Sequence, residues 1–243
     1  MSRKNRVILD TETANGLAFP LPYDFSYQIV SGNDMRLVVA RQFVIREIFL
    51  DSEMMDTAYY VAKTPIYWRR IWAHEAQLVT MYEARKQFLE DCAKYNVKEV
   101  YAYNMAFDYR ALNNLMRRLT NNQYHYFFPK HFRMCCIWNM ATDAFLATKK
   151  YYDYAVAHNW VSEKGNILTN AECAYNYIND NPTFAEAHIG IDDVVIETEI
   201  LRYCLTRHVK MDKTPKGGVW RKAQKYKVAQ RGNPLRPCAG RAL

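Results

Sequence analysis

Two acidic side chains near the start of the chain have the spacing of a metal site. Asp10 and Glu12 follow the apolar run V-I-L at 7–9, which is typical of a buried strand. Side chains two residues apart in a strand point to the same face, so both carboxylates should face one point. Carboxylates held that close resist joint ionisation, and a bound divalent cation removes the repulsion. Taken alone, the pair is more simply explained as a solvated acidic turn.

Two later segments contribute further polar residues. Asn104 and Asp108 follow a predicted strand, and Asp108 opens a helix, where an aspartate often only complements the helix dipole. His188 precedes the last predicted helix, and Asp192 and Asp193 lie in its first turn, where one of them could serve as the N-cap. Each of these segments by itself is a weak signal.

The elements that must position these residues predict an α/β fold. Strands are expected at 7–10, 27–30, 36–45, 97–103 and 132–140, with a proline-containing connection at 17–23. Helices are expected within 51–96 and at 107–119, 171–178 and 192–208, with a loop or hairpin at 161–170. Strands first, then alternating helix and strand, indicate a mixed sheet with an antiparallel start, flanked by helices. Sites in such sheets lie at strand ends and in the loops that follow them.

In combination the three segments are far more specific than each alone. D-T-E-T after the first strand, N-x-x-x-D after a later strand and H-x-x-x-x-D at the last helix occur in this order. The pattern resembles the DEDDh family of 3′–5′ exonucleases, which includes the proofreading subunits of bacterial DNA polymerases and has a ribonuclease-H-like fold. The resemblance covers about residues 5–205. The run at 169–188 looks most like exonucleases encoded by bacteriophages.

The resemblance implies a catalytic set, a cofactor and a substrate. The activity would be phosphodiester hydrolysis from the 3′ end of single-stranded DNA, with His188 as the base that takes a proton from water. The family spacing selects Asp193, five residues after His188, and leaves Asp192 for capping or for solvent. Two Mg²⁺ or Mn²⁺ ions would be held by Asp10, Glu12, Asp108 and Asp193. The terminal nucleotide would be contacted by Thr11, Thr13, Leu17 and Asn104.

Positive charge is concentrated in residues 206–243, named here the basic tail. This segment holds 11 Lys and Arg and one acid, a net of +10, whereas the whole chain carries +8. Basic residues interleaved with aromatic ones suit a nucleic-acid strand, although a solvated end is the alternative. We expect an exonuclease domain at 1–205 and a flexible tail with little regular structure. Nucleic acid would contact the tail at Lys216, Arg221, Lys222 and Lys225.

Three functions are compatible with this pattern. The basic tail favours a DNA exonuclease acting on longer strands. The resemblance to proofreading subunits is compatible with a DNA polymerase or other replication protein as partner, but the sequence does not determine whether there is one. An RNA exonuclease on the same fold is the first alternative, since the discrimination depends on contacts to the 2′-hydroxyl. The second is an inactive nucleic-acid-binding module. A protein that only binds has no reason to gather mutually repelling acids, which argues against the second alternative.

Composition excludes other classes. The chain has no run of 18 apolar residues and no segment typical of a signal peptide, so no membrane span is expected. Six cysteines without a C-x-x-C pair predict reduced thiols in a cytoplasmic protein, in the host cytoplasm if a phage encodes it. A zinc site could be imagined at His125, His131, Cys135 and Cys136, but the spacing fits no common finger and favours core packing. No function is assigned to 134–178.

Overall fold

The computed structural model describes residues 4–32 and 34–226, and its centre is a six-stranded mixed sheet. The strands are β1 (Asn5–Ala14), β2 (Leu21–Ser31), β3 (Arg36–Ile45), β4 (Gln77–Val79), β5 (Glu99–Ala102) and β6 (Arg133–Cys136). They lie in the order β4-β3-β2-β1-β5-β6. The first three strands pair antiparallel, and β4, β5 and β6 run parallel to their neighbours. The predicted α/β fold with an antiparallel start is confirmed.

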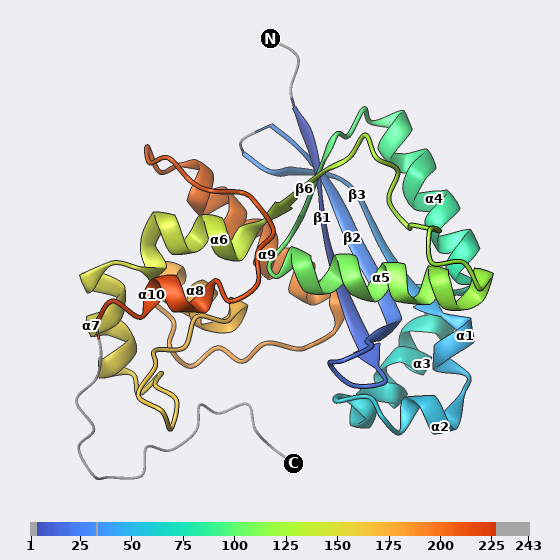
Figure 1. Cartoon of the computed structure of the whole chain (residues 1–243), viewed down its shortest axis with the longest axis horizontal. Coiled ribbons are helices and arrows are strands. Elements are labelled where there is room, and N and C mark those ends of the chain that lie inside the picture. Colours follow the sequence, from blue (N-terminus) through green and yellow to red (C-terminus); the bar gives the residue numbers. More distant parts are fainter. Residues whose placement is uncertain (1–3, 33, 227–243) are drawn as a thin grey trace.

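Helices cover both faces of the sheet (Figure 1). They are α1 (Arg46–Phe49), α2 (Ser52–Met55), the 3₁₀-helix η1 (Val61–Lys63), α3 (Thr64–Trp72), α4 (Met81–Lys94), α5 (Met105–Thr120), α6 (Ile137–Ala141), the π-helix η2 (Thr142–Leu146), α7 (Lys149–Ala157), α8 (Ala171–Asn179), α9 (Gly190–Leu205) and α10 (Trp220–Ala223). One hydrophobic cluster joins the sheet to α3, α4 and α5. A second cluster joins it to the helices from α6 to α9.

Strand β1 alternates between these two clusters. Val7 and Leu9 belong to the first cluster and Ile8 to the second, and all three are fully buried. Because the side-chain period of a strand is two, Asp10 and Glu12 share the face of Ile8, toward α9. The intervening Thr11 faces α5 instead. The alternation therefore determines which helix each polar side chain of β1 can reach.

The bounds of the strands differ from those expected, most clearly in β2 and β6. Strand β2 begins at Leu21 and includes Pro22, which pairs with Thr13 where the register of β1 and β2 shifts. An irregular position tolerates proline because no ladder donor is needed there. Strand β6 ends at Cys136, and the expected extension to 140 is wrong because α6 begins at Ile137. A short apolar run does not distinguish a strand from a buried helix.

The segment without an assigned function builds much of the second cluster. Residues 137–179 form α6, η2, α7 and α8, with a bridge between Val161 and Ile167 in the expected loop. The five described cysteines are buried thiols that form no disulfide with one another, and Cys238 lies outside the described residues. Within the described residues, none of the helices has both the length and the apolar composition needed to cross a membrane.

The described part of the basic tail, 206–226, contains little regular structure apart from α10. It is nevertheless attached to the body, where Cys136 N donates to Lys213 O at 2.8 Å. Val219 and Ala223 are buried against the body, with 3% and 0% of their surface exposed. The ribbon of this segment runs past α6 toward α7 in Figure 1. Residues 227–243 lie outside the described part.

Candidate active site

The carboxylates of β1 face the first turn of α9. Asp10 and Glu12 line one hollow of about 210 Å³ together with Asp193. Glu12 is 9% exposed, and Asp193 is 5% exposed. On the other face of β1, Thr11 Oγ1 donates to Asp108 Oδ1 at 2.8 Å. This bond holds the carboxylate of α5 beside the strand.

Asn104 and Asp108 reach the hollow because β5 runs parallel to β1. The carboxyl ends of β1 and β5 lie at the same edge of the sheet, because Ile8 of β1 pairs in parallel with Tyr101 of β5. Asn104 is the N-cap residue of α5 but makes no side-chain capping bond. Asp108 lies in the first turn of α5 and is 4% exposed. Both residues line the hollow.

The first turn of α9 separates its two aspartates. Asp192 pairs with Arg70 at 2.7 Å, on the outside of the hollow. The Asp193 carboxylate lines the hollow, and its Oδ1 has no hydrogen-bond partner among the described residues. A buried oxygen without a donor is costly and indicates a missing ligand. This contrast favours Asp193 as the ligand.

A close contact brings α9 against β2. Gly190 N donates to Asp24 Oδ2 at 3.3 Å. A Cβ atom at Gly190 would lie only 2.9 Å from Asp24 Oδ1 and from Ser26 Oγ. Any side chain at the start of α9 would therefore force Asp24 and Ser26, or the first turn of α9, to shift.

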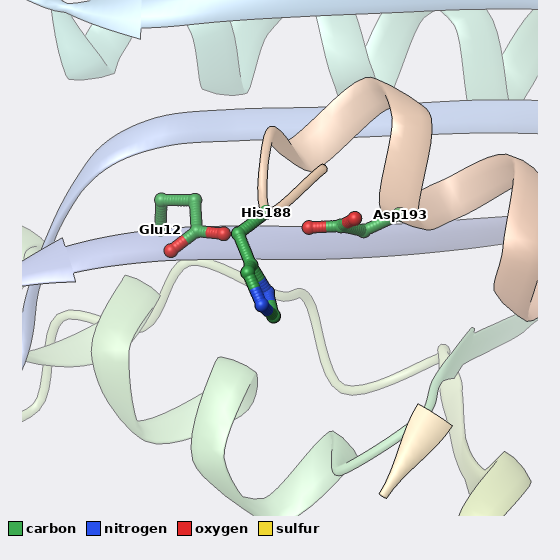
Figure 2. A group of neighbouring side chains, drawn as sticks. All are labelled: Glu12, His188 and Asp193. Carbon is green, nitrogen blue, oxygen red and sulfur yellow. The ribbon is translucent and has the colours of Figure 1, made fainter. Parts of the chain in front are cut away.

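His188 is held by the segment that precedes α3. Its backbone is left-handed, with φ at 49°. The imidazole stacks on Tyr60, with ring centroids 4.4 Å apart and 13° between the planes. Lys63 Nζ donates to the neighbouring Ala187 O. Figure 2 shows His188 between the carboxylates of Glu12 and Asp193, and one potential ligand atom of each lies within 4.8 Å of the others.

Two glutamates of the hollow are absent from the predicted set. Glu197 lies one turn after Asp193 on α9, and its Oε2 accepts from Tyr103 N at 2.9 Å. Glu186 lies two residues before His188, and its Oε2 is 3.6 Å from His188 Nδ1. Both line the hollow. The i, i+4 spacing of Asp193 and Glu197 on a predicted helix was the signal for the first. Glu186 had no such signal.

Burial and mutual repulsion raise the pKa values of these acids. Burial raises the pKa of Asp10 well above its usual value, and Glu197 and Asp108 add repulsion. Burial raises the pKa of Asp108 to about 7. Burial, followed by repulsion from Glu186, raises the pKa of Asp193 to about 8. The carboxylates of the hollow therefore repel one another when ionised, and a bound cation would offset this repulsion.

The imidazole of His188 responds in the opposite direction. Burial and the positive charge of Lys63 lower the pKa of His188 to about 4. The ring is consequently neutral near pH 7 and has a lone pair available. A neutral imidazole beside buried carboxylates can accept a proton or act as a ligand.

Other predicted site residues lie outside the hollow. Thr13 pairs with Pro22 at the register shift. Leu17 lies in the turn after β1 and is 78% exposed. In the tail, Lys216 pairs with Asp212 at 2.7 Å, and Lys222 pairs with Asp143 at 3.4 Å. Arg221 and Lys225 are exposed at the surface.

Comparison with known proteins gives matches in structure only. Neither protein-family models nor curated proteins match the sequence. The structure resembles cell-death related nuclease 4 (CRN-4), with a TM-score of 0.50 and 16% identity over 86% of this chain and 66% of that one. It resembles Exonuclease I of E. coli in complex with a dA16 oligonucleotide, with a TM-score of 0.53 and 11% identity over 84% of this chain. A full-length 3′-exonuclease matches with a TM-score of 0.50 and 10% identity over 84% of this chain and 61% of that one.

The fold is that of ribonuclease-H-like exonucleases. The mixed sheet of this fold places β1, β5 and α9 so that their polar side chains meet in the hollow described above. The chain spans 41% of the length of the matched Exonuclease I chain. What the two chains share is the exonuclease fold.

Proposed function

We propose that this protein is a metal-dependent 3′–5′ exonuclease that removes nucleotides from the 3′ end of single-stranded DNA. The observation that carries the proposal is the convergence of Asp10, Glu12, Asp108 and Asp193 with His188 in one hollow. These acids come from three separate elements, and the fold is shared with exonucleases. A solvated acidic turn, the simpler explanation of Asp10 and Glu12, would not bury them against further acids.

The hollow fits hard divalent cations. Its donors are carboxylate oxygens, which Mg²⁺ and Mn²⁺ prefer, and Asp193 Oδ1 lacks any donor among the described residues. Two ions would be held by Asp10, Glu12, Asp108 and Asp193. When bound, such a pair lowers the pKa of water and stabilises charge on the leaving oxygen. One matching structure of E. coli Exonuclease I is a zinc-bound form in complex with single-stranded DNA.

The chain's own groups would manage the proton and the substrate. His188, neutral at pH 7 and oriented by Tyr60, would take the proton of the attacking water. Thr11 would keep the Asp108 carboxylate in place through its hydrogen bond. The terminal nucleotide would lie along Thr11–Thr13 and Leu17, with Asn104 on the opposite wall. The exposure of Leu17 leaves it accessible to a base.

Labelled oligonucleotides test this function. Single-stranded DNA and RNA, labelled at either end, would be incubated with the protein in Mg²⁺, Mn²⁺ or EDTA. Stepwise loss from the 3′ end of DNA in metal alone is expected, and Asp10→Ala and His188→Ala should abolish it. Glu90→Ala, which removes an exposed acid of α4 outside the hollow, is the matched control. Cleavage in EDTA, or preference for RNA, would overturn the corresponding part of the proposal.

A further inference from the structure

A second cavity of about 570 Å³ adjoins the candidate active site. Tyr103, Asn104 and Ala171 line both this cavity and the carboxylate hollow. The remaining walls are Trp138 of α6, the loop between α7 and α8, and Trp220 at the start of α10. Its volume lies within the usual range for small-ligand sites, roughly 300–1,000 Å³. None of these outer walls belongs to the residues predicted as the active site.

The cavity has the chemistry of a site for a flat aromatic ligand. Trp138 stacks on Tyr103, with ring centroids 5.9 Å apart and 17° between the planes. Its indole Nε1 donates to Thr169 Oγ1 at 3.1 Å, so the ring is fixed. Trp220 is 38% exposed and presents an accessible ring. Lys164 adds a positive charge to the same lining. Nucleobases stack on such aromatic rings, and a lysine suits the adjoining phosphate.

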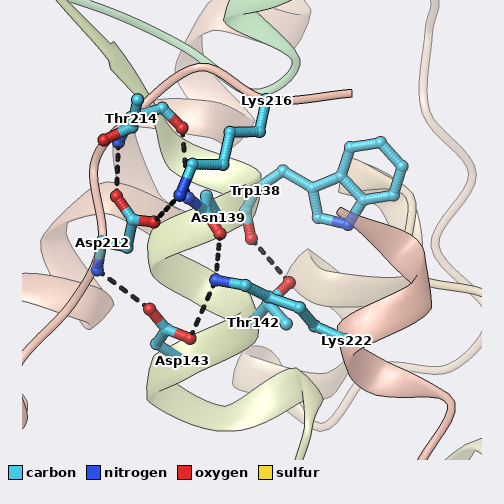
Figure 3. A network of polar contacts seen from close by, with 8 residues as sticks. All are labelled: Trp138, Asn139, Thr142, Asp143, Asp212, Thr214, Lys216 and Lys222. Atoms are coloured by element: carbon cyan, nitrogen blue, oxygen red, sulfur yellow. Dashed lines mark hydrogen bonds and ion pairs between the residues drawn. The ribbon is translucent and has the colours of Figure 1, made fainter. Parts of the chain in front are cut away.

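A polar network binds the basic tail to α6 and η2 at residues before and after Trp220 in the chain, and Figure 3 shows the side chains of this network. Lys222 Nζ donates to Asn139 Oδ1 at 2.6 Å and lies 3.4 Å from Asp143 Oδ1. Asp212 N donates to the other oxygen of Asp143 at 2.9 Å. Asn139 Nδ2 in turn donates to Thr214 O at 3.1 Å. The tail is thereby bound to α6 and η2 both before Trp220, at Asp212 and Thr214, and after it, at Lys222.

A second attachment fixes the tail to the loop on the opposite wall. Ile167 N donates to Gln224 Oε1 at 2.9 Å, and Gln224 Nε2 donates back to Ile167 O at 3.0 Å. The paired bonds connect α10 to the loop that carries Lys164 and Thr169. Trp220 is therefore a built part of the cavity rather than a loose surface residue.

We propose that this cavity binds the base of the penultimate nucleotide at the 3′ end of a single strand. The inference rests on the proposed exonuclease function. The scissile phosphate, held at the carboxylate hollow, joins the terminal nucleotide to the penultimate one. The terminal nucleotide is assigned to Thr11–Thr13, Leu17 and Asn104, and of these only Asn104 lines this cavity, at its border with the hollow. The base on the other side of that phosphate then reaches the cavity past Asn104, and Trp220 stacks on it.

The test couples a protein change to a substrate change. Trp220→Ala and Trp220→Phe would be compared with the unmodified chain on DNA that is intact or abasic at the penultimate position. Loss of one base–aromatic stack predicts a fall of about tenfold in kcat/KM for Trp220→Ala, with Trp220→Phe nearly unchanged. The abasic substrate should be cleaved equally by all three proteins, because the contact is already absent. Trp72→Ala, a change at a 74% exposed tryptophan of α3, is the matched control and should behave as the unmodified chain.

Binding without cleavage separates the two proposals. Fluorescence anisotropy in EDTA measures Kd for the same oligonucleotides, and the same pattern of losses is expected. If the Kd values show these losses but no DNA is cleaved in the presence of metal, the exonuclease proposal is rejected and the proposal of a nucleobase site stands. Equal values for Trp220→Ala and the unmodified chain on intact DNA would overturn the site. The site would also be overturned if Trp220→Ala lowered the affinity by the same factor on intact DNA and on DNA abasic at the penultimate position. It would be overturned likewise if the effect of Trp220→Ala disappeared only on DNA abasic at the terminal position.

Discussion

Acidic side chains gather in two regions of this molecule, and their electrostatic surroundings differ. In the carboxylate hollow, Asp10 and Asp193 are buried among other acids, and their pKa values are raised. Beside α6, Asp143 and Asp212 meet lysines of the basic tail. The hydrogen bond from Lys216 and the backbone N–H of Thr214 lower the pKa of Asp212. One cluster is neutralised by lysines of the same chain, whereas the acids of the other repel one another, and a bound cation would stabilise them.

This electrostatic difference distinguishes a candidate functional site from a surface contact that attaches the tail. Paired charges near the surface contribute little stability. Here the pair of Lys222 with Asp143 attaches the tail to the body. Buried acids without a cationic partner lower stability, which makes them candidates for a ligand site or a catalytic site. Five changes of condition or sequence would break or sharpen this comparison.

The largest effect is expected from Asp193→Asn compared with Asp192→Asn. Asp193 lines the hollow and Asp192 pairs with Arg70 outside it, so only the first change removes a proposed metal ligand. Turnover should fall by on the order of 10³-fold for Asp193→Asn and less than about threefold for Asp192→Asn. Steady-state hydrolysis of labelled DNA measures both. Loss of turnover in Asp192→Asn alone would show that the ligand is misassigned.

A metal-free preparation should lose stability as the pH rises from 6.5 to 8.5. The folded pKa values of Asp108 and Asp193, about 7 and about 8, exceed their ordinary value of 3.8. The folded state therefore binds more protons than the unfolded one, and stability present at low pH is lost as these groups ionise. His188, whose pKa is lowered to about 4, acts oppositely but only below about pH 6.5.

The expected loss is on the order of a few kcal/mol in the free energy of unfolding. Denaturant unfolding in EDTA measures it, and excess Mn²⁺ should stabilise the protein more at pH 8.5 than at pH 6.5. A metal-free stability that rises over this interval would contradict the raised pKa values. The double variant Lys216→Met with Lys222→Met, which changes only the neutralised cluster, should leave the slope unchanged.

Tyr60→Leu should reduce kcat by about tenfold with little change in KM. The variant removes the ring on which His188 stacks at 4.4 Å, so the base is less well oriented for proton transfer. Tyr124→Leu, at a 75% exposed position, is the control. A change in KM alone would indicate that Tyr60 contacts substrate instead of positioning His188.

Arg221→Gln with Lys225→Gln should weaken binding of single-stranded DNA by a few fold. These side chains are exposed and available to phosphates, so the dependence of log Kd on log salt should flatten by about one unit for each lost contact. Anisotropy titrations between low and high salt measure the slope. An unchanged slope would exclude these two tail residues from binding.

The smallest effect is expected from Lys222→Met on stability. Its ion pair with Asp143 is partly exposed, so the free energy of unfolding should fall by less than about 1 kcal/mol, and Mn²⁺ should not change the difference. Removal of the lysine leaves Asn139 Oδ1 without this donor. A fall of several kcal/mol in the free energy of unfolding would mean that the contact between the tail and the body is essential to the fold and not a weak surface attachment.

Local patterns predicted a large part of the fold and several residues of the hollow. The antiparallel start, α5 and α9 followed from alternation and helical spacing, and the period of two placed Asp10 and Glu12 on one face. Strand β6 was predicted too long because the apolar run Ile137–Ala141 is compatible with both a buried strand and a buried helix. The assignment of the basic tail to nucleic acid rested on charge, which does not reveal that Lys222 is paired with the body.

Sequence by itself determined which acids are available at strand ends and helix starts, because periodicity and capping act over a few residues. Tertiary structure alone decided that Tyr60 stacks on His188, that Glu197 faces Asp10, and that Trp220 closes a cavity beside Asn104. These contacts join segments far apart in the chain. They depend on how helices pack across the sheet, and no local preference encodes that packing.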